Sequence, residues 1–242
     1  MGMTMRPLAL LALSTLLPAV ALGDEITTAA GNAADPALDL VRASVSRDGR
    51  DLIFALTVAG EAGSALPAAG GALGGATVWS YVWPTGLDSA IVGFEAGQGI
   101  LAFAVTVHPD FDDTPLFDED GDGTLDNDGA RWHSHWVVLE PDGGCGAGSL
   151  KVKAIPEGAT PRLPKTWPGL PILIDSPGWA PRFEAATLRV RVPFEEPPVA
   201  GTAYDGVTAA LRVNASVHDP LLCVVDVFDV ASGDLSLPGR VE

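Results

Sequence analysis

The chain has 242 residues, of which 31 are acidic and 14 basic, so its formal net charge at pH 7 is −17. This charge argues against partners that attract basic patches, namely nucleic acids and anionic membrane surfaces. The length suits one domain that is large enough to bury a hydrophobic core.

The first 23 residues have the pattern of a secretory signal peptide. Arg6 precedes an apolar run from Leu8 to Leu22, and Ala21-Leu22-Gly23 forms a small-x-small cleavage site. The run is too short for a lasting membrane span, and no cysteine follows it as a lipoprotein anchor would require. We therefore expect residues 24–242 to work in the periplasm or as a secreted protein, without a membrane anchor.

Strand signals dominate the rest of the chain. Residues 39–46 and 51–59 alternate polar and apolar side chains, and the Asp-Gly between them predicts a hairpin turn. Residues 60–76 and the proline-rich residues 156–185 are predicted as irregular loops. Many short strands separated by turn signals predict an all-β fold, a single-domain antiparallel β-sandwich of jelly-roll-like type with long loops. The further predicted strands cover residues 77–83, 89–94, 100–107, 131–139, 149–155, 186–192, 207–217 and 221–230.

The opening hairpin, from Asp39 to Val58, resembles the start of DOMON-like and family-9 carbohydrate-binding-like domains. These exported domains often begin with a strand of this kind, followed by an Asp-Gly turn and an alternating apolar strand. The resemblance covers this hairpin alone, and it implies a β-sandwich fold.

An acidic stretch at residues 110–129 separates two of the predicted strands and is expected to bind calcium. It holds nine of the 31 acidic residues and no lysine or arginine. Aspartates at spacing two followed by Gly123 form the core of a calcium loop, in which the backbone curls around the ion and the glycine permits the turn. The predicted ligands are Asp118, Asp120, Asp122, the backbone carbonyl of Thr124, Asp126 and Asp128.

The spacing DxDxDGxxD resembles one unit of a thrombospondin type 3 repeat and also half of an EF-hand. It departs from the EF-hand at the twelfth position, where Gly129 replaces the bidentate glutamate, and no helical pattern flanks it. The pattern therefore predicts an isolated structural calcium loop between two strands. A solvated acidic loop without an ion is the alternative.

The four histidines suggest a second metal site. His133 and His135 are two residues apart, so on a strand they share one face. If residues 100–107 pair with residues 131–139, His108 lies near them, and His218 could be a fourth ligand. Three neutral imidazoles suit Zn²⁺ or copper, and we favour copper in an exported protein. In the alternative interpretation, the pair faces solvent or hydrogen-bonds the acidic loop.

Two cysteines remain to be placed, Cys145 and Cys223. An even pair in an exported protein predicts a disulfide.

Together these features predict an exported, non-catalytic binding protein that is stabilised by calcium and carries a histidine site for copper or zinc. One alternative is a metal-dependent enzyme, because His133 and His135 followed by Glu140 resemble part of the first cupin motif, although the glycines of that motif are missing. Another is a carbohydrate-binding module, and a protein ligand also stays open. The aromatic residues that could line a sugar-binding face are Trp79, Trp83, Trp167 and Trp179.

Overall fold

The computed structural model describes residues 24–68, 74–109, 118, 120–125, 131–196, 198, 200–216 and 219–241. The expected signal peptide at residues 1–23 lies outside these ranges. Within them, no helix has both the length and the apolar character needed to cross a membrane.

The predicted all-β, antiparallel fold is confirmed, and its strands form two large sheets and one small one. The five-stranded sheet has the order β1 (Ile26–Thr27), β2 (Leu40–Asp48), β3 (Asp51–Val58), β10 (Thr187–Val192) and β9 (Arg182–Glu184). The seven-stranded sheet has the order β5 (Ile100–Val107), β4 (Thr77–Pro84), β12 (Val207–Val213), β13 (Leu222–Val230), β7 (Leu150–Val152), β6 (His133–Pro141) and β8 (Ile174–Asp175). A short ribbon joins β11 (Ala203–Tyr204) to β14 (Gly239–Arg240).

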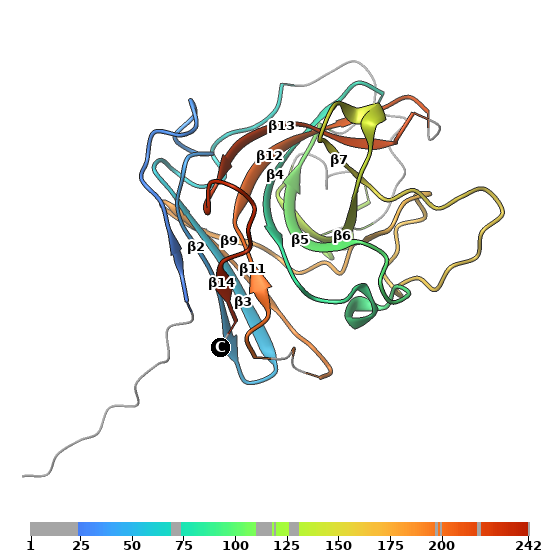
Figure 1. The fold of residues 1–242 in the computed structure, drawn as a ribbon, viewed down its shortest axis with the longest axis horizontal. Coiled ribbons are helices and arrows are strands. Elements are labelled where there is room, and N and C mark those ends of the chain that lie inside the picture. The colour runs from blue at the N-terminus through green and yellow to red at the C-terminus, as the bar shows by residue number, and fades with distance from the viewer. Residues whose placement is uncertain are drawn as a thin grey trace, which may run out of the picture.

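The seven-stranded sheet closes on itself. Strands β5 and β6 also pair with each other, from Ile100 opposite Leu139 to Thr106 opposite His133. Six strands, β5-β4-β12-β13-β7-β6, therefore form a closed, barrel-like ring, with β8 added beside β6. Figure 1 shows these strands curving around one another beside the five-stranded sheet. Closure into a barrel was not part of the predicted fold. It arises because strands that are far apart in the sequence pair with each other.

The five-stranded sheet packs against the outer face of the barrel. Phe54 of β3 lies at the centre of this core, with its ring centroid 4.7 to 5.8 Å from those of Phe103, Trp83 and Trp136. Strand β3 alternates regularly between buried and half-buried residues because only one of its faces is covered. Strand β5 is buried along almost its whole length, because one face meets this core and the other faces the barrel interior.

One predicted strand is wrong. Residues 89–94 were expected to be extended, but the structure has the 3₁₀ turn η1 (Ser89–Val92) there. The Asp88 carboxylate accepts a hydrogen bond of 2.8 Å from the backbone N–H of Ala90, and Gly93 ends the turn with φ of 107°. These local capping interactions outweigh the weak strand preference of a short apolar run.

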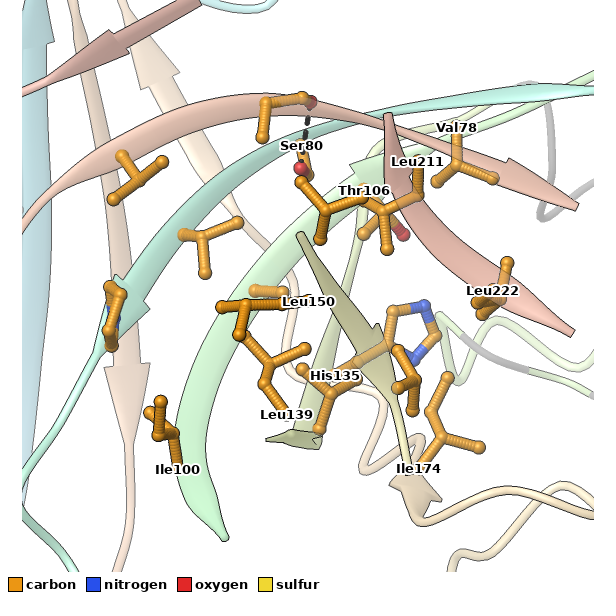
Figure 2. A pocket seen from close by; sticks show the side chains of 18 of the residues that line it. Val78, Ser80, Ile100, Thr106, His135, Leu139, Leu150, Ile174, Leu211 and Leu222 are labelled. Carbon is orange, nitrogen blue, oxygen red and sulfur yellow. Dashed lines mark hydrogen bonds between the residues drawn. The ribbon is translucent and has the colours of Figure 1, made fainter. Parts of the chain in front are cut away.

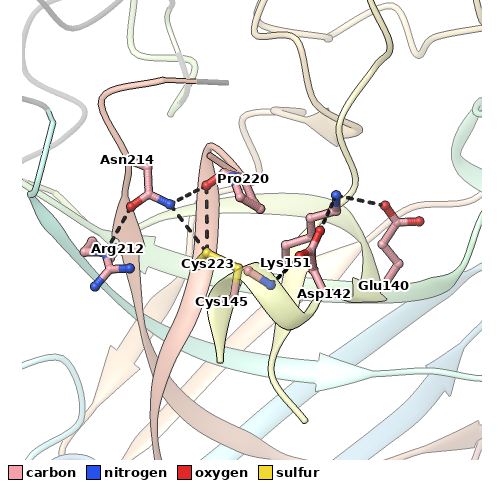
Figure 3. The surroundings of a disulfide bond; sticks show 9 residues. Glu140, Asp142, Cys145, Lys151, Arg212, Asn214, Pro220 and Cys223 are labelled. Carbon is pink, nitrogen blue, oxygen red and sulfur yellow. Dashed lines mark hydrogen bonds and ion pairs between the residues drawn. A yellow bond between two sulfur atoms is a disulfide. The ribbon is translucent and has the colours of Figure 1, made fainter. Parts of the chain in front are cut away.

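The predicted disulfide between Cys145 and Cys223 is present, with the two Cα atoms 5.4 Å apart. Cys145 ends the 3₁₀ turn η2 (Gly143–Cys145), and Cys223 lies in β13 (Figure 3). Strand β7 pairs with β13 at a single position, Cys223 opposite Lys151. The covalent bond therefore reinforces the shortest ladder of the barrel.

Replacing both cysteines with serine should lower the free energy of unfolding. The disulfide closes a segment with a sequence separation of 78 residues. Without the bond the unfolded chain gains conformational entropy, which in the chain-entropy model lowers the free energy of unfolding by about 4.5 kcal/mol for a loop of this length. Urea unfolding of the oxidised protein, the reduced protein and the double serine variant measures the effect. Equal midpoints for all three would show that the bond adds no stability.

Candidate functional site

The acidic loop brings three predicted ligands together. Asp118, Asp120 and Asp122 each place a carboxylate oxygen within 4.8 Å of the others. Carboxylate oxygens of the same residues also shape the loop, since Asp118 accepts from the backbone N–H of Gly123 at 3.0 Å and Asp122 from that of Thr124 at 2.8 Å. The Oδ1 atom of Asp118 is buried and has no hydrogen-bond partner among the described residues. A buried carboxylate oxygen of this kind is expected to need a cation or a donor.

The backbone geometry of this loop also suits an oxygen-coordinated cation, and one side-chain cation already lies beside it. The Arg131 guanidinium lies 2.7 Å from Asp122 and 3.5 Å from Asp120, so the loop already holds one positive group at its edge. Gly121 and Gly123 adopt φ of 74° and 86°, which only glycine tolerates easily, and this lets the chain curl. Thr124, the predicted carbonyl ligand, follows Gly123 in the same loop, and its backbone N–H donates to Asp122. The other predicted ligands, Asp126 and Asp128, lie outside the described residues.

The acidic loop packs against the segment that follows β8. Gly121 and Gly178 approach so closely that a Cβ atom on Gly178 would lie 3.4 Å from the Cα atom of Gly121. The same segment is tied to β6, because the Ser176 hydroxyl lies 3.0 Å from Nδ1 of His135. A continuous series of contacts therefore joins the acidic loop to the barrel wall.

The structure brings three of the four histidines together, as their spacing predicts. His133 and His135 are both buried, with ring centroids 4.7 Å apart, and the ring of His108 lies 5.2 Å from that of His133. His133 contacts the Thr106 hydroxyl through Nε2 at 3.2 Å and the Arg131 carbonyl through Nδ1 at 2.9 Å.

This histidine cluster does not have the geometry of the aspartate cluster. The three described rings do not offer one nitrogen each within 4.8 Å of one another, whereas the three aspartates do offer oxygens at that spacing. His218 lies outside the described residues. The copper or zinc site therefore stays a prediction, and the observed contacts of these rings are hydrogen bonds to protein groups.

Among the described residues, those predicted to carry the two alternative functions do not form the corresponding sites. Glu140 alternates onto the face of β6 opposite to His133 and His135, and it forms ion pairs with Lys151 and Lys153, so it cannot share an ion with those histidines as a cupin would require. The four tryptophans proposed for a sugar platform are buried or half-buried. Trp83 lies fully in the core, and Trp79 packs against Phe228.

The barrel encloses a cavity of about 290 Å³ that sequence reasoning missed. Aliphatic side chains from all six barrel strands line it, together with the side chains of Ile174, Leu235 and Leu237. Its described lining includes no lysine, arginine, aspartate or glutamate. Figure 2 shows these side chains converging on the interior. The polar lining residues are Ser80, Thr85, Thr106, His108 and His135.

Small inward-facing residues leave this space open. Ala104 of β5 lies between Val82 of β4 and His135 of β6 in the ladder, and Ala209 of β12 lies opposite Ser80. Larger side chains at these two positions would fill the barrel. In the sequence they resemble ordinary core residues, and only closure of the sheet shows that they face a cavity.

Comparison with known proteins identifies no relative. No protein-family model matches the chain, and no curated protein or solved structure shows significant similarity to it.

Asp175, beside Ser176, should make stability depend on pH. Burial raises the pKa of its carboxyl to about 6, although hydrogen bonds from the Thr166 hydroxyl and the Ser176 N–H favour the charged form. The folded-state pKa therefore lies above the unfolded value. Below pH 4 both states are protonated and the group has no effect, whereas stability falls as pH rises from 4 to 6.

Asp175→Asn removes this charge and keeps an acceptor for Thr166. It should stabilise the protein by about 2 kcal/mol at pH 7.5 and by almost nothing near pH 3.5. Denaturant unfolding at the two pH values measures the difference, with the exposed Glu157→Gln as a control. An equal gain in stability at both pH values would refute the assignment of this pH dependence to Asp175.

Proposed function

We propose that the protein binds an apolar small molecule inside its β-barrel and works, after export, as a non-catalytic binding protein. The cavity is the observation that carries the proposal. Its volume of about 290 Å³ is roughly twice the ~150 Å³ of an engineered apolar cavity that holds benzene. The disulfide supports an oxidising compartment, which here means the periplasm or the exterior of the cell.

The lining explains why an apolar ligand would bind. Transfer of hydrocarbon surface from water into an aliphatic cavity is favourable and nearly proportional to the area covered. Three of the described lining residues are exposed to solvent, and all three are aliphatic: Ile100, Val227 and Leu235 are 37%, 48% and 43% exposed. A ligand that covered them would remove apolar surface from water at the edge of the cavity as well as inside it.

Filling the barrel should abolish binding. Ala104→Phe places a ring in the cavity, and it should weaken the binding of N-phenyl-1-naphthylamine, measured by its fluorescence, by at least about tenfold. Ala96→Phe makes the same change at an exposed position and should leave binding unchanged. Circular dichroism checks that both variants fold. If Ala104→Phe does not fold, Ala209→Leu fills less of the cavity and replaces it in the test. Undiminished binding in a folded, filled barrel would exclude the interior as the site.

We also propose that the acidic loop binds Ca²⁺ as a structural ion. The buried, unpartnered Oδ1 of Asp118 beside two more carboxylates favours this over a solvated loop. Asp118, Asp120 and Asp122 would hold the ion, and its charge would relieve the repulsion among them.

Calcium should therefore raise the melting temperature. At a concentration a hundred times Kd, the expected stabilisation is about 2.7 kcal/mol. Calorimetry with Ca²⁺ and with EDTA should show this in the natural chain and in the exposed control Glu157→Ala, but not in the Asp118→Ala/Asp120→Ala variant. A calcium response that persists in the double variant would place the ion elsewhere.

A further inference from the structure

The ladder register shows that Ser80, Thr106 and His135 lie toward one end of the β5–β6 pair. The other end is aliphatic except for Thr85, whose hydroxyl donates to the Leu101 carbonyl. Thr106 lies opposite Ser80 on β4 and opposite His133 on β6, so three neighbouring strands carry polar side chains at one level. At the other end of the β5–β6 pair, Ile100 lies opposite Leu139. Figure 2 shows Ile100 and Leu139 on one side of the cavity, with Thr106 and His135 displaced toward the other.

The polar end is the buried one. Ser80 is fully buried, and the side chains of Thr106 and His135 are buried as well. Each takes part in a hydrogen bond, with the Ser80 hydroxyl donating to the Ala209 carbonyl at 2.9 Å. Leu211 and Leu222 also line this cavity, so the polar groups form one wall and do not surround the space. The exposed lining residues, in contrast, are all aliphatic.

We infer that the ligand is a single-chain amphiphile that binds with its polar head inward, at the wall formed by Ser80, Thr106 and His135, and its hydrocarbon tail toward Ile100. This inference rests on the proposed function. A polar head buried among aliphatic side chains would lose its hydration without compensation, whereas this wall can hydrogen-bond it. A tail at the other end would cover apolar surface that water now touches.

The charge of the lining selects among head groups. The described lining has no lysine or arginine to compensate an anionic head, so a carboxylate would lose its hydration without a permanent counter-charge. An uncharged head with a hydrogen-bonding oxygen, such as the hydroxyl of a long-chain alcohol, has no such cost. The ligand class is therefore a neutral chain amphiphile.

Competition against N-phenyl-1-naphthylamine tests this class with three probes of equal chain length: decane, decan-1-ol and decanoate. Decan-1-ol should bind more tightly than decanoate at pH 8. Thr106→Val should weaken the binding of decan-1-ol by about fivefold, because one hydrogen bond to the ligand is lost. The affinity for decane should not change. Thr27→Val is the matched control, because Thr27 is exposed on β1 and does not line the cavity. This control should leave the affinities for decane and decan-1-ol unchanged.

Orientation is measured separately by nuclear Overhauser contacts in methyl-labelled protein. The terminal methyl of decan-1-ol should contact Ile100, and its first methylene should contact the Thr106 methyl. The reversed set of contacts, tightest binding by decanoate, or equal weakening of decane and decan-1-ol by Thr106→Val would overturn the inference while apolar binding stands. Failure of all three probes and of the naphthylamine to bind would instead remove the proposed function.

Discussion

The backbone pairing of β5 with β6 is the constraint on which the rest of the molecule depends. These strands are separated along the chain by the acidic loop, and their hydrogen bonds close the seven-stranded sheet into a barrel. Without that ladder, the inward-facing side chains of β4, β5 and β6 would form one face of an open sheet, and no cavity would exist. Closure also places His108, just after β5, beside His133 at the start of β6.

Closure gives the same strands two different environments. The outward face of β5 contributes Phe103 to a dense aromatic core with Phe54, while its inward face contributes Ala104 to the cavity. The dense face holds the five-stranded sheet in place, and the open face leaves room for a ligand. The barrel wall is therefore densely packed on its outer face, whereas its inner face leaves space unfilled.

Local features of the fold follow from the sequence, whereas the cavity does not. The hairpin of β2 and β3 was predictable because one face meets solvent, so its alternation is visible, and the shared face of His133 and His135 follows from the two-residue period of a strand. The cavity depends on a non-local pairing, and residues such as Ala104 look like ordinary core when their neighbours are unknown. The η1 turn was missed because its cap at Asp88 outweighs a short apolar run.

The single-position ladder between β7 and β13 has a consequence for association between chains. Among the described residues, β13 pairs with β7 only at Cys223. On the side of β13 that faces β7, the residues after Cys223 therefore form a sheet edge, with Val225 and Val227 exposed. Such an edge is a template for another strand, and proteins protect it with charges and bulges. Asp226 stands exposed between the two valines, and two register shifts interrupt the β12–β13 ladder. Both features are of the kind that disfavours pairing of this edge with a second chain.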